Sequence, residues 1–214
     1  MKILFVSSEC APFSKSGGLA DVAFSLPPAL QKTGDELTIV TPMYRVTQEN
    51  YGDQFSLIKT CVIHLGQRQI SCSLYKGELN GVTVYAIGNE HLFHRPRLYG
   101  YGDDSLRFAF FCRAVIDLLP EFGDLPDILH CNDWETALAI LYLKNDAVLN
   151  EALSHIKTVY TIHNIAYQGQ FGRSEMETTF ALPDGWYHGG LSYEFEGRQD
   201  INLMKGAMLM ADAV

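Results

Sequence analysis

Basic residues are scarce in this sequence. Of its 214 residues, 16 are Lys or Arg and 25 are Asp or Glu, so the formal net charge at pH 7 is -9. Binding to nucleic acid depends on clustered cations that neutralise phosphates. The charge balance therefore excludes nucleic acid as an expected partner.

Long apolar runs are also missing. No stretch approaches the roughly 20 apolar residues that a membrane-spanning helix needs. The N-terminal segment MKILFVSSEC has one basic residue and a short apolar run, without the cleavage site of a signal peptide. We expect a cytoplasmic protein with no membrane partner.

The cysteines and histidines lack the spacing of a disulfide framework or a metal site. Five cysteines, an odd number, occur without any CxxC pair, which favours reduced thiols. They are Cys10, Cys61, Cys72, Cys112 and Cys131. His91 and His94 have no HExxH helix around them, so no zinc site is expected. The absence of GxSxG removes support for a serine hydrolase.

Hydrophobic residues, at 47% of the chain, follow an alternating pattern of strands and helices. Strands are expected at residues 2–8, 36–42, 126–133 and 157–164, with helices at 17–34, 105–120 and 134–146. Three β-rich runs at 55–65, 70–79 and 82–88 interrupt the alternation. The pattern predicts an α/β, Rossmann-like fold whose mostly parallel twisted sheet is flanked by helices and carries an inserted antiparallel section. We expect one domain over residues 1–214.

Several local signals refine this prediction. Pro27 and Pro28 should kink or divide the first helix, and Asn80-Gly81 should close a hairpin. The aromatic and glycine-rich loop 88–104 is long enough to indicate a role at a site. Residues 198–214 have a helical pattern and stop on an apolar run, so we expect the chain to be about half of a larger protein.

The segment SKSGGLADV follows the first strand and opens the first helix. Gly17 and Gly18 would let an anion approach the free N–H groups of the helix N-terminus, with Lys15 adding a charge and Ser16 a hydroxyl. Asp21 in the first turn could accept hydrogen bonds from a polyhydroxyl ligand. A tight turn beside a solvated lysine, and an acid favoured only by the helix dipole, are the alternatives.

Two later strand ends should lie at the same edge of the sheet as this segment, because ligands of open α/β sheets collect at the carboxyl ends of the strands. The first places Asn132 and Asp133 at a turn, where either could cap a helix or bind sugar hydroxyls. The second offers imidazole, amide and phenol groups that suit a hydroxyl-rich ligand. These groups belong to His163, Asn164, Tyr167 and Gln168, followed by Gly169. At a fourth strand end, Tyr44 and Arg45 are expected at the surface.

Together the segments KILFVSSECAPFSKSGGLADVAFSLPPAL, ILHCNDWETAL and TVYTIHNIAYQGQF resemble the N-terminal catalytic domain of bacterial glycogen synthases and plant starch synthases. The resemblance covers essentially the whole chain. It implies the N-terminal half of a GT-B glycosyltransferase, which transfers glucose from ADP-glucose to the non-reducing end of an α-1,4-glucan with retention of configuration. It implies ADP-glucose, the glucan and a C-terminal nucleotide-binding domain absent from this chain as partners, with no metal or other cofactor required.

The resemblance also assigns roles to the candidate residues. Asp133 and His163 match catalytic positions that face the transferred glucose. Substrate binding falls to Lys15 near the donor phosphate, to Ser16, Gly17 and Gly18 in its loop, to Asp21 near the acceptor, and to Asn132, Asn164, Tyr167, Gln168 and Gly169. Without the second domain, the chain is expected to be inactive by itself.

Three positions depart from the commonest form of the family. Ser16 replaces threonine, Ala20 replaces glycine, and Asn132 stands where histidine is frequent. None of these changes removes a charge or a glycine from the predicted phosphate loop. A related GT-B enzyme with another nucleotide sugar, and a glucan-binding module without catalysis, remain alternatives.

Overall fold

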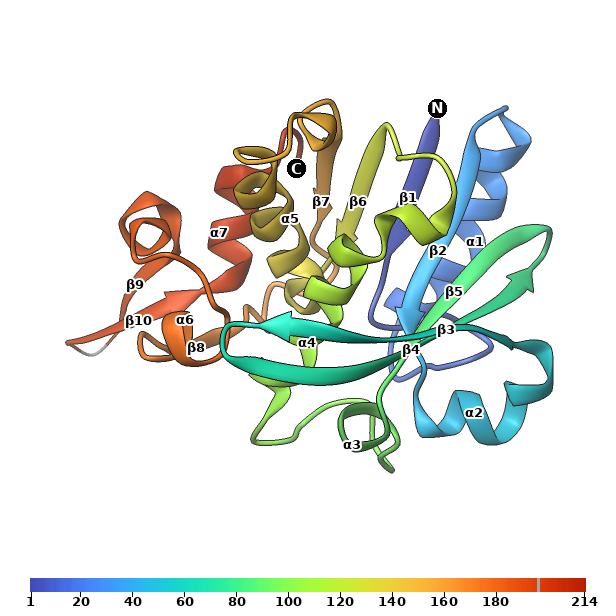
Figure 1. Ribbon diagram of the computed structural model, residues 1–214, viewed down its shortest axis with the longest axis horizontal. Coiled ribbons are helices and arrows are strands. Elements are labelled where there is room, and N and C mark those ends of the chain that lie inside the picture. Colours follow the sequence, from blue (N-terminus) through green and yellow to red (C-terminus); the bar gives the residue numbers. More distant parts are fainter. Residues whose placement is uncertain (196) are drawn as a thin grey trace.

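A seven-stranded twisted sheet organises the computed structural model, which describes residues 1–195 and 197–214 (Figure 1). Its strand order is β3-β4-β5-β2-β1-β6-β7. The parallel strands are β1 (Lys2–Val6), β2 (Glu36–Pro42), β5 (Val82–Gly88), β6 (Ile128–Asn132) and β7 (Lys157–Thr161). The inserted antiparallel strands are β3 (Ser56–Leu65) and β4 (Arg68–Leu79). The α/β architecture with an inserted antiparallel section is confirmed.

Helices cover both faces of this sheet (Figure 1). The longer ones are α1 (Leu19–Lys32), α4 (Asp104–Asp117), α5 (Trp134–Ala147) and α7 (Leu203–Met210). Shorter helices are α2 (Arg45–Tyr51), α3 (Glu90–Phe93) and α6 (Glu175–Thr178), with 3-10 turns at Gly52–Gln54, Leu119–Phe122 and Glu151–Leu153 and a π-helical turn at Tyr187–Leu191. No helix in the described ranges is long and apolar enough to cross a membrane.

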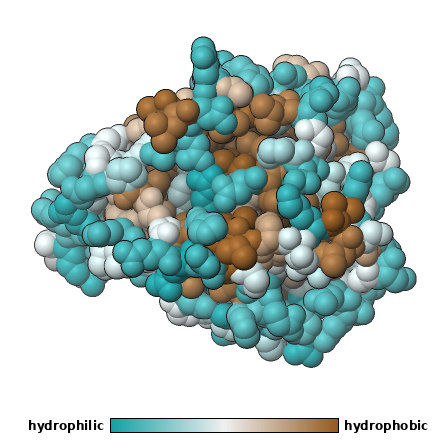
Figure 2. All heavy atoms as spheres, in the orientation of Figure 1, coloured by the Kyte–Doolittle hydropathy of each residue, from teal (hydrophilic) through white to brown (hydrophobic). Residues whose placement is uncertain are grey.

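Strand β1 explains why both faces are covered. Its alternating side chains enter two separate cores: Ile3 and Phe5 pack with Ala23 of α1, whereas Leu4 and Val6 belong to the core that includes α4 and α5. A strand that is buried on both faces has a continuous apolar sequence, and KILFV is such a sequence. In the view of Figure 2, hydrophilic side chains separate the remaining apolar ones into small patches.

Pro27 and Pro28 were expected to kink or divide the first helix, and division is wrong, because α1 continues unbroken through both prolines. Pro27 lies on the buried stripe of α1 with Leu19 and Ala23. Burial of that stripe against β2 holds the helix together, although each proline removes one backbone hydrogen bond. The hairpin at Asn80-Gly81 is confirmed, and both residues have positive φ, 52° and 84°.

The helix predicted over 198–214 is also partly wrong. Residues 198–202 form β10 (Arg198–Asn202), which pairs antiparallel with β8 (Gln170–Gly172) and β9 (Ser192–Phe195) in a second small sheet. The helix begins only at Leu203, where the Asn202 side chain accepts a hydrogen bond from the Lys205 N–H and caps it. It ends at Met210.

Candidate functional site

The candidate site lies at the carboxyl ends of β1, β6 and β7, which are neighbours in the sheet. A pocket of about 820 Å³ opens there. Its lining comes from the loop before α1, the loop before α4, the start of α5 and the loop after β7. In the described ranges, this lining contains four carboxyl side chains and no Lys or Arg: Glu9, Asp104, Asp133 and Glu135. Such a pocket suits a polyhydroxyl ligand better than a free anion.

Seven of the predicted residues line this pocket. They are Ser16, Gly17, Gly18, Asp133, His163, Asn164 and Tyr167. Three chain segments that are distant in the sequence thus meet at one edge of the sheet. The other five predicted residues, which are Lys15, Asp21, Asn132, Gln168 and Gly169, lie beside or beneath the pocket and are described below.

Lys15 and Asp21 form an ion pair beside the glycine turn. The Lys15 ammonium donates to Asp21 Oδ1 at 2.6 Å, and both side chains are more than half exposed, at 51% and 60%. An exposed pair of this kind contributes little to stability. Neither side chain is therefore committed to a fixed structural role, and either can turn toward a ligand.

Asp133 has an unusual backbone conformation, with φ of 59° and ψ of 178°. Its carboxylate does not cap α5. Instead, Asp133 Oδ1 accepts from the backbone N–H groups of His163, at 2.7 Å, and Asn164, at 3.2 Å. The helix-cap alternative for Asp133 is therefore wrong, because this carboxylate joins the turn after β6 to the loop after β7.

Asn132 fixes the orientation of the His163 ring from beneath. The buried Asn132 amide nitrogen donates to Val6 O at 3.0 Å, so its oxygen faces His163 Nε2 at 2.9 Å. That oxygen can only accept, so Nε2 carries the proton in neutral His163 and Nδ1 is left as an acceptor. The neighbouring His130 has its pKa lowered to about 4 by burial and by His163, and it is neutral near pH 7.

Gln168 and Gly169 support the loop rather than the pocket. Gln168 Oε1 accepts from Asn202 Nδ2 at 2.7 Å. Gly169 has φ of 63° and lies against the Trp134 ring, where an added Cβ would be 2.7 Å from Trp134 Cε3. Only glycine meets both conditions without strain.

Gly169→Ala is expected to lower the free energy of unfolding by about 2–4 kcal/mol, since it adds the cost of positive φ to a clash with the indole. Gly81→Ala is the matched control, because Gly81 also has positive φ, 84°, but nothing within 4 Å of an added Cβ. Urea-induced unfolding of the two variants separates the cost of the positive φ from the cost of the clash with the indole. Equal losses would show that the Trp134 contact contributes nothing.

Several residues of the pocket were not predicted from the sequence, among them Glu9, Tyr99 and Glu135. Burial and the nearby carboxylates of Asp133 and Glu9 raise the pKa of Glu135 to about 8. Its Oε2 is buried without a hydrogen-bond partner in the described structure. Glu9 and Tyr99 could not be recognised easily in the sequence, since Glu9 stands in a polar run after β1 and Tyr99 in the loop 88–104.

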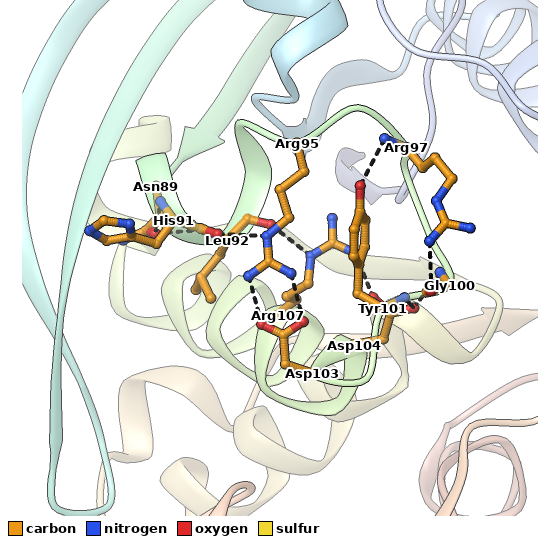
Figure 3. Close-up of polar contacts among 10 residues, drawn as sticks. All are labelled: Asn89, His91, Leu92, Arg95, Arg97, Gly100, Tyr101, Asp103, Asp104 and Arg107. Atoms are coloured by element: carbon orange, nitrogen blue, oxygen red, sulfur yellow. Dashed lines mark hydrogen bonds and ion pairs between the residues drawn. The ribbon is translucent and has the colours of Figure 1, made fainter.

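The loop 88–104 does contribute to the pocket, as its length suggested, through Tyr99, Gly100 and Asp104. Figure 3 shows how its end is held. The fully buried Arg107 guanidinium donates to Asp104 Oδ1 at 2.5 Å, and Asp104 Oδ2 accepts from the Gly100 N–H at 2.7 Å. Arg95 forms a two-bonded pair with Asp103. These contacts make the loop a rigid wall.

The fourth strand end contributes nothing to the pocket lining, and the surface position predicted for Tyr44 is wrong. Tyr44 is fully buried in the core, whereas Arg45 pairs with Glu49 at the surface. Among the described residues, no group of three or more potential metal ligands comes together. A separate pocket of about 650 Å³ at the opposite edge, beside Arg113, contains none of the predicted site residues.

The chain is similar in sequence to starch and glycogen synthases. The sequence profile of the starch synthase catalytic domain matches residues 2–214. Over the full chain, the sequence is 42% identical to a glycogen synthase from Bacillus cereus strain Q1, of which it covers 44%. It is 39% identical to a glycogen synthase from Anoxybacillus flavithermus, again covering 44% of that protein. The chain thus spans less than half the length of these curated relatives.

A solved structure shares the fold. The catalytic domain of starch synthase IV from Arabidopsis thaliana, bound to ADP and acarbose, matches 99% of this chain with a TM-score of 0.85 and 28% sequence identity. The match covers 43% of that structure. The α/β arrangement described above is therefore the one found in part of a starch synthase catalytic domain.

Proposed function

From the premise that this chain belongs to the starch synthase catalytic domain family, we propose that it is the acceptor-side half of a GT-B glycogen synthase. The whole protein would transfer glucose from ADP-glucose to the non-reducing end of an α-1,4-glucan with retention of configuration. The observation that carries the proposal is the acidic pocket at the ends of β1, β6 and β7, where Asp133, His163 and Asn164 converge. The alternating fold around it is also found in the starch synthase IV catalytic domain.

The charges of the pocket suggest that this chain contacts mainly the sugar and that the C-terminal domain contacts mainly the phosphate. Transfer from a sugar diphosphate develops positive charge on the sugar and negative charge on the leaving phosphate. The negative carboxylate of Asp133 is suited to stabilise the positive charge on the sugar. The phosphate needs cations, which the lining described here lacks, so we infer that most of them come from the C-terminal domain. Lys15, exposed beside the glycine turn, is the cation that we expect this chain to offer from the rim.

The side chains also orient the sugar. His163, held by Asn132, presents Nδ1 as an acceptor, and the Asn164 amide offers donor and acceptor groups. Groups held in fixed positions reduce the entropy that must be lost on reaching the transition state. The proposal requires no metal ion: the leaving phosphate can take the proton of the incoming hydroxyl on the same face of the sugar.

The test of this function is incorporation of labelled glucose into glycogen by the full-length protein, with the 214-residue chain assayed beside it. Label from ADP-glucose with the full-length protein alone would support the proposal and the need for both domains. Label only from UDP-glucose would assign another donor. No label from either donor, together with co-sedimentation of the chain with glycogen, would favour a binding module and contradict the synthase function.

Lys15→Ala in the full-length protein is expected to lower turnover at least tenfold, equivalent to about 1.4 kcal/mol of barrier. The reason is loss of the positive charge beside the glycine turn, where the donor phosphate is proposed to bind. Initial rates at saturating ADP-glucose measure the effect. Lys32→Ala, at the other end of α1, is the control and should retain full activity. Unchanged rates for Lys15→Ala would remove Lys15 from the site.

A further inference from the structure

The carboxylate of Glu9 occupies the donors of the glycine turn. Glu9 lies between β1 and α1 and is 4% exposed. Its Oε2 accepts from the backbone N–H groups of Ser16, at 2.5 Å, and Gly17, at 3.1 Å. Its Oε1 accepts from the Ser16 hydroxyl at 2.6 Å. The N–H of Gly17 and the hydroxyl of Ser16, both expected from the sequence to meet a ligand anion, are therefore bonded to an acid of the protein itself.

The same carboxylate reaches across to the loop 88–104. Tyr99 Oη lies 2.9 Å from Glu9 Oε1 and also 2.9 Å from Ser8 Oγ. A phenol has one proton, so it donates to the carboxylate and accepts from the Ser8 hydroxyl. Glu9 thus joins two pocket walls that are about 90 positions apart in the sequence.

One of these walls is held by a buried arginine, whereas the other is rich in glycine. Tyr99 precedes Gly100, which is held through Asp104 to the buried Arg107, and the Arg107 guanidinium lies 4.9 Å from the centre of the Tyr101 ring (Figure 3). The turn at Gly17 and Gly18, in contrast, has open space around both glycines. Consecutive glycines lose more backbone entropy than other residues when they are ordered.

We propose that Glu9 is a positioning residue that fastens the glycine-rich Ser16–Gly18 turn to the Tyr99 loop and so sets the geometry of the donor side of the pocket. The proposal rests on the function proposed above for its catalytic consequence. The internal carboxylate gives the turn the conformation that a bound anion would otherwise have to impose. The N–H of Gly18 and the ammonium of Lys15 are the groups of this turn that we expect to meet a ligand phosphate.

Two substitutions in the full-length protein test this role. Glu9→Gln keeps the shape of the side chain but replaces the carboxylate by a neutral amide. Its oxygen can still accept from the turn, but those bonds lose their charge assistance, and its NH2 can only donate to the hydroxyls of Ser16 and Tyr99. Tyr99→Phe removes the bond between the two walls and leaves those to the turn. We expect kcat/KM for ADP-glucose to fall about tenfold or more in Glu9→Gln and about threefold in Tyr99→Phe, mainly through kcat.

Hydrogen exchange is the readout that does not depend on activity. In Glu9→Gln the amides of Ser16 and Gly17 should exchange at least about tenfold faster, while the amides of β1 keep their rates. Unchanged exchange at Ser16 and Gly17 would overturn the proposal. So would faster exchange with undiminished glucose transfer, since the fastening would then have no effect on catalysis.

The double variant separates positioning from direct contact with substrate. If Glu9 acts by joining the turn to Tyr99, Glu9→Gln with Tyr99→Phe should lose no more activity than Glu9→Gln alone. Losses that multiply would show that the two side chains act independently and would overturn the proposal. Inactivity of the unaltered protein with both ADP-glucose and UDP-glucose would contradict the proposed function, and the exchange rates would still decide whether Glu9 holds the turn.

Discussion

Asp133→Asn is expected to lower the turnover of the full-length protein about 100-fold while leaving its fold intact. Asparagine keeps the oxygen that accepts from the His163 and Asn164 N–H groups, and it tolerates positive φ better than most residues. Only the charge is removed. In the proposed reaction, the positive charge that develops on the transferred sugar then loses the counter-charge of Asp133.

Rates of glucose incorporation at saturating ADP-glucose, measured beside thermal unfolding, check this expectation. Asp124→Asn is the control, because Asp124 pairs with Lys2 near the opposite edge of the sheet and lies far from the pocket lining. The control should keep its turnover. If Asp133→Asn kept its turnover as well, with an unchanged unfolding temperature, the charge of Asp133 would have no part in the reaction.

The position of the candidate site could be predicted because the strands are regular. Apolar runs of about five residues reveal parallel strands, and the carboxyl ends of neighbouring parallel strands must share one edge. Ser16, Asp133 and His163 each follow such a run, and the structure brings all three to one pocket. Which loop positions face the pocket was harder to predict, as the support roles of Asn132 and Gly169 show.

The contacts inside the site could not be predicted, because they join residues that no local pattern relates. The bonds of Glu9 to Ser16 and to Tyr99 depend on how two loops of irregular conformation pack. The strand at 198–202 was missed for a similar reason. Its partners β8 and β9 have only three and four residues, too short for a recognisable alternation. Tertiary pairing there outweighs the helical pattern.

Glu135→Gln is expected to stabilise the protein at neutral and alkaline pH. Burial raises the pKa of Glu135 from an ordinary value of 4.5 to about 8 in the folded protein, and Oε2 has no partner in the described structure to offset the loss of water. Glutamine has a similar shape and no charge at any pH. The variant therefore removes the cost of ionising a buried group and retains the packing at the start of α5.

The pH window of this effect follows from the two pKa values. Below about 4.5 the glutamate is protonated in both folded and unfolded chains, so its ionisation has no effect on stability. Between pH 4.5 and 8 the unfolded chain releases the proton and the folded protein keeps it, so stability falls as pH rises. Relative to wild type, Glu135→Gln should thus gain stability across this window, by on the order of 5 kcal/mol in total, and no more above pH 8.

Urea-induced unfolding of wild type and Glu135→Gln at several values between pH 5 and 9 measures this gain, with the exposed Glu177 changed to Gln as the control. A gain that rises with pH and levels off near pH 8 would establish that the carboxyl at the floor of the pocket is largely protonated at neutral pH. Glu135 would then be a hydrogen-bond donor beside the acceptors Asp133 and Glu9. A gain independent of pH would show that Glu135 ionises as freely in the folded protein as in the unfolded chain, and the pocket would hold one more negative charge.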